Sequence, residues 1–224
     1  MQLKKAHRYI IFFFALLPIT AYAQTSLYKL PKGRTGLELG FRTAENTNTI
    51  SGSLDYGIDK DLKISFIGGV ALIEDDTLNT SLEIPPAPVG GLSIVRINAL
   101  GQTGLDYFLN GSFSAMFSRT VNAGTSETFV KTRTLELIGG GGVLKRLGTK
   151  SGWSITPFFG VYYSNVWAVT ERQWTELEEA VSDSDILGEA GVEIQISKTT
   201  SIIGSLLFSF QSSDTAFSIG INLY

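Results

Sequence analysis

Nine charged side chains stand at alternate positions of otherwise apolar segments, and they are the residues best placed to do chemistry. Six are acidic and three are basic, so an interior that they share would favour cations. Two carboxylates can also hydrolyse a glycosidic bond, but only within about 5 to 9.5 Å of each other. Glu189 and Glu193 would be about 13 Å apart along a strand, at about 3.3 Å per residue. The nine are Glu38, Arg42, Asp55, Lys63, Arg96, Asp106, Glu136, Glu189 and Glu193.

The first 23 residues have the pattern of an export signal. A basic start with Lys4, Lys5 and Arg8 precedes the apolar run 9–17 and the small-residue pattern that ends at Ala23. This order predicts a secretory signal peptide that is cleaved after Ala23. A membrane-spanning helix is the alternative, but the run is about half of the roughly 20 residues that such a helix needs.

Composition then limits the function. Cleavage removes the only histidine and leaves a chain without histidine or cysteine, and the formal net charge falls from −3 to −6. Without these residues the usual Ser/His and Cys/His nucleophile pairs cannot form. An acidic chain also lacks the basic surface that nucleic-acid binding needs. We therefore expect no enzyme activity, no catalytic residue, no metal site, no cofactor and no nucleic-acid partner.

Residues 24–224 are predicted to form a single domain of alternating strands. Leu37, Leu39 and Phe41 face one side of the first strand, for example, while Glu38 and Arg42 face the other. Period-two alternation is typical of a strand with one apolar face. Ten segments follow this pattern, although 8 or 12 strands remain possible. The segments are 37–42, 50–56, 62–72, 95–107, 113–117, 135–143, 153–163, 186–196, 202–210 and 217–223.

The connections are predicted to alternate between short and long. A tight turn is expected at Asn110-Gly111, a dipeptide typical of hairpins. Long acidic loops are expected at 74–90 and 171–185. The run Gly139–Gly142 is not a phosphate-binding loop, because no Lys-Ser/Thr follows it, so a crowded sheet is the better explanation.

The alternating strands, the turn at 56–63 and the final residues Ala216–Tyr224 resemble the small bacterial outer-membrane β-barrel proteins. The resemblance implies an all-β fold, a transmembrane antiparallel up-and-down barrel of about ten strands. It also implies a place in the bacterial outer membrane, contact with lipid and lipopolysaccharide, and recognition of Phe217–Tyr224 by the barrel-insertion machinery. A soluble exported β-sandwich would alternate in the same way, but aromatic residues near the predicted strand ends are typical of membrane girdles.

Two functions remain open for such a barrel, and the oligomeric state is open as well. The first is a small pore for passive transport, lined by the nine charged residues and favouring cations. The second is a non-conducting structural or surface-interaction barrel, in which those charges pair inside a filled interior and the outer loops bind partners. A channel for apolar compounds would instead be lined by Ile67, Met116, Phe158 and Leu207.

Overall fold

The computed structural model describes residues 27, 29–74, 82–148, 153–172 and 175–224. The predicted signal peptide lies outside these residues, so its cleavage stays a prediction. None of the described residues forms a helix that is long and apolar enough to cross a membrane.

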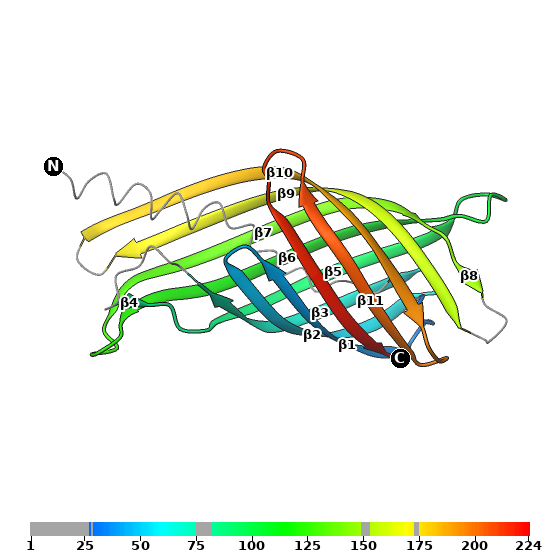
Figure 1. Ribbon diagram of the computed structural model, residues 1–224, viewed down its shortest axis with the longest axis horizontal. Coiled ribbons are helices and arrows are strands. Elements are labelled where there is room, and N and C mark those ends of the chain that lie inside the picture. The colour runs from blue at the N-terminus through cyan, green and yellow to red at the C-terminus, as the bar shows by residue number, and fades with distance from the viewer. Residues whose placement is uncertain (1–26, 28, 75–81, 149–152, 173–174) are drawn as a thin grey trace.

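Ten long antiparallel strands form a closed barrel (Figure 1). Each long strand pairs with the next one along the chain, and the last strand pairs with the first, from Leu37 opposite Leu223 to Ala44 opposite Ala216. The predicted fold class and strand number are therefore confirmed. The long strands are β1 (Thr35–Ala44), β2 (Thr47–Asp59), β3 (Leu62–Ile73), β5 (Ala87–Ala99), β6 (Asp106–Asn122), β7 (Thr128–Leu144), β9 (Ser154–Arg172), β10 (Thr175–Gln195), β11 (Thr200–Ser209) and β12 (Thr215–Leu223), and two short strands are β4 (Leu82–Glu83) and β8 (Leu147–Gly148).

The outer surface of the barrel is apolar, and the inner surface mixes polar and apolar side chains. Large apolar side chains that point outward are about half exposed, such as Leu39 at 55% and Phe66 at 56%. Their inward neighbours, such as Glu38 at 2% and Ser65 at 2%, are buried. A continuous exposed apolar band costs free energy in water and is stable in lipid, so the outer face is suited to a bilayer.

The two ends of the barrel differ. At the end that we call the terminal end, β1 begins and β12 ends; at the opposite end, the mouth end, β6, β7, β9 and β10 extend beyond the other strands (Figure 1). The predicted loop at 171–185 is wrong, because Glu178–Asp185 pair with Ser164–Glu171 and lengthen the β9–β10 hairpin. A strand needs about 9 to 11 residues to span a bilayer, so the 19 residues of β9 and the 21 of β10 carry this hairpin out of the membrane.

The predicted turn at Asn110-Gly111 is also wrong. Both residues lie within β6, which pairs with β5 and β7 across this point. The chain turns instead between β5 and β6, where Gly101 and Gly104 adopt positive φ angles of 59° and 71°. Glycine takes such angles without a steric cost, so this link can be tight.

The four glycines of β7 explain how neighbouring strands approach one another closely. A Cβ atom added to Gly142 would collide with the carbonyl oxygen of Phe159, and one added to Gly140 would collide with that of Val161. A Cβ atom on Gly139 would meet no heavy atom within 4 Å. Within this run Gly140, Gly141 and Gly142 therefore serve the close packing of the barrel wall, as the sequence indicated, whereas Gly139 faces open space.

Replacing Gly142 with alanine is expected to lower the free energy of unfolding by about 1 to 3 kcal/mol, because the added methyl group must displace the backbone of β9. Urea unfolding followed by tryptophan fluorescence measures this change. The matched control is Gly139→Ala, which adds the same group to open space on the same strand. Equal stabilities of the two variants would contradict the explanation.

Candidate functional site: the barrel interior

The nine predicted residues do not all lie inside the barrel. Seven are buried in the interior: Glu38, Arg42, Asp55, Lys63, Glu136, Glu189 and Glu193. Asp106 follows the inward alternation at the start of β6, is partly exposed and lies 3.8 Å from Arg146 Nε. Arg96 is exposed on the outer face of β5, with its neighbours Val95 and Ile97 buried inside at 2% each. The sequence pattern predicts the reverse for these three residues, with Arg96 inside and Val95 and Ile97 outside. The prediction is wrong because it joins β5 and the start of β6 into one strand.

Two of the buried charges form an ion pair between β2 and β3. Lys63 Nζ lies 3.0 Å from Asp55 Oδ2. Ser53 donates its hydroxyl to the other carboxylate oxygen of Asp55 at 2.9 Å. All three side chains are at most 3% exposed, so the charges are compensated by each other and not by water.

A second polar group surrounds Glu193 near the terminal end. One carboxylate oxygen of Glu193 accepts hydrogen bonds from the hydroxyl of Ser201, from that of Tyr224 at 3.2 Å and from the amide of Asn222 at 3.4 Å. The partners come from β11, β12 and the residue after β12. The inward position of Tyr224 follows from the alternation of β12, but its contact with Glu193 joins residues 31 positions apart and has no local sequence signal.

A third polar group lies farther into the barrel, around Glu189 and Glu136. Glu189 accepts hydrogen bonds from Tyr162 at 2.9 Å and from Ser205 at 2.7 Å. Glu136 accepts one from Ser164 at 2.9 Å. The positive charge of Arg42 interacts electrostatically with both carboxylates. Arg42 therefore balances acidic residues from two other strands.

Apolar side chains fill the space between these polar groups. Phe108 packs edge to face against Phe158, with 6.4 Å between ring centroids, and also contacts Tyr162. The four residues proposed as the lining of an apolar channel do point inward, but Ile67, Met116 and Phe158 are buried and Leu207 is partly buried. The main cluster contains Leu27, Val95, Ile97, Phe108, Ile138, Leu144, Phe158, Tyr162, Leu187 and Ile203.

Leu27 in that cluster belongs to a segment that precedes β1 and lies inside the barrel. We call residues 27 and 29–34 the closing segment. Leu27 and Leu30 are only 5% and 3% exposed. Arg146 donates to the carbonyl oxygen of Leu27 at 3.2 Å, and Lys29 pairs with Asp61 at 3.1 Å. These contacts fix the segment to the wall at the terminal end.

Gly57 on β2 makes room for the closing segment. The backbone of Gly57 exchanges hydrogen bonds with Gly33 at 2.8 Å and Arg34 at 2.9 Å. A Cβ atom on Gly57 would collide with the carbonyl oxygen of Pro31. The sequence offered no signal for this arrangement, because the segment has no strand alternation and its partners are distant.

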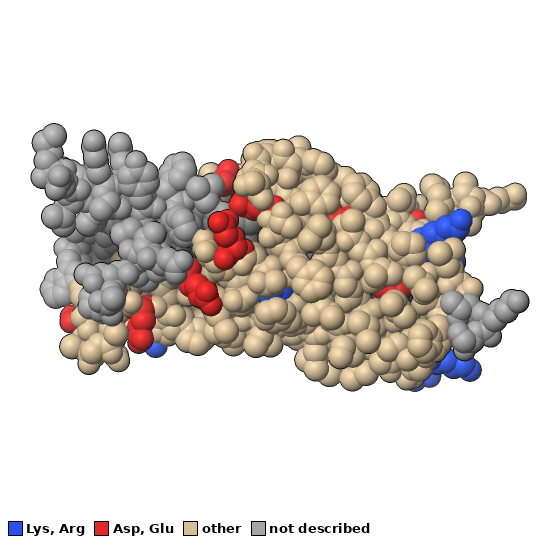
Figure 2. Space-filling model, in the orientation of Figure 1, with Lys and Arg blue, Asp and Glu red and all other residues tan. Residues whose placement is uncertain are grey.

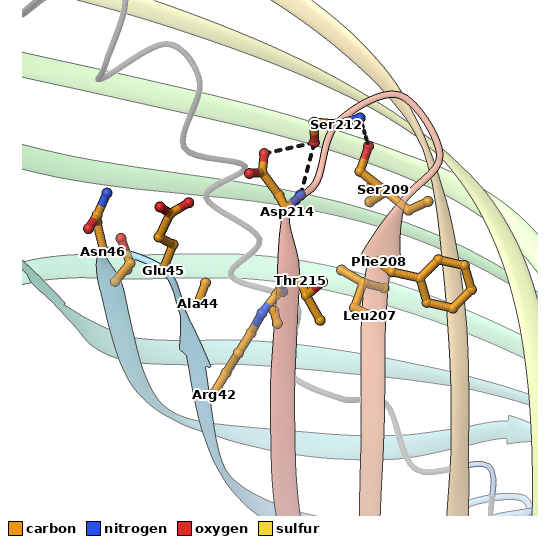
Figure 3. Close-up of a pocket in the computed structure, with 13 residues that line it drawn as sticks. Arg42, Ala44, Glu45, Asn46, Leu207, Phe208, Ser209, Ser212, Asp214 and Thr215 are labelled. Carbon is orange, nitrogen blue, oxygen red and sulfur yellow. Dashed lines mark hydrogen bonds between the residues drawn. The ribbon is translucent and has the colours of Figure 1, made fainter.

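At the mouth end the interior opens into a pocket of about 270 Å³, which we call the mouth pocket. Its walls come from the mouth-end parts of β1, β2, β11 and β12, from the β1–β2 and β11–β12 turns, and from Leu187 in the middle of β10 (Figure 3). Arg42, Leu187, Leu207 and Ala216 lie toward the interior, while Glu45 and Asp214 belong to the turns. The base of the pocket is thus apolar apart from Arg42, and its rim is polar.

The arrangement of the interior holds its carboxylates in fixed positions. Buried carboxylates accept hydrogen bonds from serine, tyrosine and asparagine, and these donors hold them in fixed positions. Across the described residues, no three His, Cys, Asp or Glu side chains gather closely enough to hold a metal ion.

A closed antiparallel barrel with an apolar outer band is typical of proteins that span the bacterial outer membrane. Comparison with solved structures supports this fold. The closed ten-strand barrel is the fold of the small bacterial outer-membrane β-barrel proteins, and the NalP translocator domain described below supports this fold. No protein-family model matches it, and a search of curated proteins finds no significant match.

Three solved structures illustrate the similarity. The translocator domain of the autotransporter NalP from Neisseria meningitidis superposes with a TM-score of 0.54 at 9% identity, covering 84% of this chain and 86% of that one. Ail, the attachment invasion locus protein of Yersinia pestis, gives 0.40 at 10% identity, covering 85% and 96%. The N-terminal barrel domain of OprF from Pseudomonas aeruginosa gives 0.39 at 8% identity, covering 87% and 98%. At these identities the likeness concerns the fold alone.

Proposed function

We propose that this protein is an outer-membrane barrel that is closed to ions in its resting state and acts through its mouth end, outside the cell. The packed interior carries the proposal. Inward residues along the barrel are almost inaccessible to water, with Ile203 at 0% and Phe108 and Met116 at 1% exposed. An open aqueous channel would wet such side chains, so a continuous water path does not fit this packing.

The mouth end supports a role in surface interaction. Beyond the apolar band, the outer faces of β6, β7 and β9 turn polar at Arg119, Arg133 and Glu171, and Arg133 forms an ion pair with Glu171. On the face in Figure 2, most acidic side chains lie toward this end and most basic ones toward the terminal end. Loops and hairpins that extend beyond a rigid barrel are a common place for binding.

The orientation of the barrel is part of the same proposal. Both ends of the barrel-forming chain lie at the terminal end, which corresponds to the periplasmic side in single-chain outer-membrane barrels with short periplasmic turns. The segment Phe217–Tyr224 would then meet the barrel-insertion machinery from the periplasm. We propose no catalytic step for this function.

Conductance across a planar bilayer tests the closed state. The chain without residues 1–23, refolded and shown to be heat-modifiable on a gel, is expected to give no reproducible current steps. A porin inserted in the same bilayer provides the positive control. Reproducible steps from the folded protein at low voltage would contradict the closed resting state.

Passage of small cations through a gated barrel is a second candidate function. It is favoured by the interior charge, because the described part of the chain buries five acidic residues and two basic ones. It is also favoured by the closing segment, which the side chains of Arg146 and Lys29 connect to the barrel wall. This function requires that the closing segment leave the interior.

A further inference from the structure

The mouth pocket has the dimensions of a site for a small molecule. Its volume of about 270 Å³ is just below the range of about 300 to 1,000 Å³ that is typical of ligand sites. Leu187 is 2% exposed and Leu207 is partly buried, so the base of the pocket is built from packed core residues. A ligand body that covers this base would be apolar and small.

The charged residues around the pocket determine which polar group a ligand would carry. Arg42 at the base is 8% exposed, and its charge already interacts with Glu136 and Glu189. The rim carries two more carboxylates, Glu45 and Asp214, from the β1–β2 and β11–β12 turns (Figure 3). Among the described residues, neither rim carboxylate is within 4 Å of a Lys or Arg side-chain nitrogen.

The β11–β12 turn holds one of these carboxylates in place. Ser212 donates its hydroxyl to Asp214 Oδ2 at 2.8 Å, and the backbone N–H of Ser212 bonds to the hydroxyl of Ser209 (Figure 3). This leaves the other oxygen of Asp214, and the exposed Glu45, to receive a cation. The pocket therefore combines an apolar base with an anionic rim.

We propose that the mouth pocket binds a small amphipathic amine, with its apolar body on Leu187, Leu207 and Ala216 and its ammonium group between Glu45 and Asp214. The site rests on the proposed function for its position, since only a mouth end that faces the outside gives such a molecule direct access. Binding itself does not require the barrel to conduct ions or to stay closed.

Methyl NMR of the protein in lipid nanodiscs tests the site with a matched series of probes. Hexylamine, hexanol and hexanoate share one apolar chain and differ in charge. Hexylamine is expected to shift the methyl signals of Leu187, Leu207 and Ala216 in a saturable way, and to bind more tightly than hexanol or hexanoate. Methyl groups on the lipid face, such as those of Leu39 and Leu137, report simple partitioning into the bilayer.

Variants separate the two halves of the pocket. The double change Glu45→Gln/Asp214→Asn is expected to weaken hexylamine binding about fivefold and to leave hexanol binding unchanged, because two partly exposed ion pairs are lost. Glu127→Gln removes an exposed carboxylate of the β6–β7 turn, outside the pocket, and is the matched control. Leu207→Trp, or the smaller Ala216→Leu if that variant fails to fold, is expected to abolish binding of both molecules.

Three results would overturn the site: tighter binding of hexanoate than of hexylamine, equal effects of the rim variant and Glu127→Gln, or shifts that are confined to lipid-facing methyl groups. Conductance is recorded separately on the same samples. A conducting barrel that still binds hexylamine would overturn the closed resting state and leave the site intact. A barrel that gives no current steps and does not bind hexylamine would overturn the site and leave the closed resting state intact.

Discussion

Replacing Lys63 with methionine is expected to lower the free energy of unfolding by about 3 to 5 kcal/mol, because Asp55 then keeps a buried charge without its partner. The two groups are 3.0 Å apart and nearly inaccessible to water. Methionine preserves most of the apolar length of lysine, so the change removes charge more than volume. Urea unfolding, monitored by tryptophan fluorescence and by the heat-modifiable band on a gel, measures the loss.

The double variant Asp55→Asn/Lys63→Met is the control for this prediction. It removes both charges, so most of the lost stability is expected to return. The asparagine oxygen can still accept the Ser53 hydroxyl, but the new amide N–H group faces methionine and has no acceptor there, which keeps part of the cost. Two equally unstable variants would show that packing around Lys63, and not the lost pair, sets the cost. Unchanged stability in Lys63→Met would contradict the buried ion pair itself.

Deleting residues 24–33 is expected to turn a silent barrel into one that gives reproducible, cation-preferring current steps. The deletion removes Leu27 from the interior cluster and empties the space that it occupies at the terminal end. That space adjoins a small cavity lined by Leu27, Phe108 and Glu189. Leu187, two residues before Glu189 on β10, already lines the mouth pocket, so little packing would separate the two ends.

Planar-bilayer recording with asymmetric salt measures both the steps and their selectivity. Lys32→Ala serves as a matched control, because Lys32 belongs to the closing segment but is exposed, and that variant is expected to stay silent. A folded deletion variant that also stays silent would contradict gated passage, since the remaining side chains would then close the barrel by themselves. Current steps from the deletion variant and also from the full chain would contradict the closed resting state.

The strands could be predicted from the sequence because membrane and interior impose a strict period of two. Leu37, Leu39 and Phe41 have no other place than the outer face once Glu38 is inside. The turns were less predictable, because they depend on local residues that strands also tolerate. Asn110-Gly111 has the composition of a hairpin, yet both residues pair on two sides within β6. The segment 171–185 is acidic, which is typical of loops, yet Glu178–Asp185 pair with β9 in the β9–β10 hairpin.

The interior was predictable as a face but not as a set of contacts. Alternation places Glu189 and Glu193 inside, whereas their partners Tyr162 and Tyr224 come from other strands and follow from strand register. Register depends on where each turn falls. Because the turn between β5 and β6 was predicted at Asn110-Gly111, β5 and the start of β6 were read as one strand, and Arg96 was put on the wrong face. The closing segment had no pattern at all, since its position is determined by the cavity that the finished barrel provides.

The burial of Leu27 is linked to the closure of the barrel. The seam between β1 and β12 joins strands from opposite ends of the chain, so the sheet stays open until the last strand has arrived. Leu27 precedes β1 by eight positions and is enclosed once this seam has formed. Burial of Leu27 is therefore complete only when β1 and β12 have paired, so opening of this seam would expose Leu27 to water.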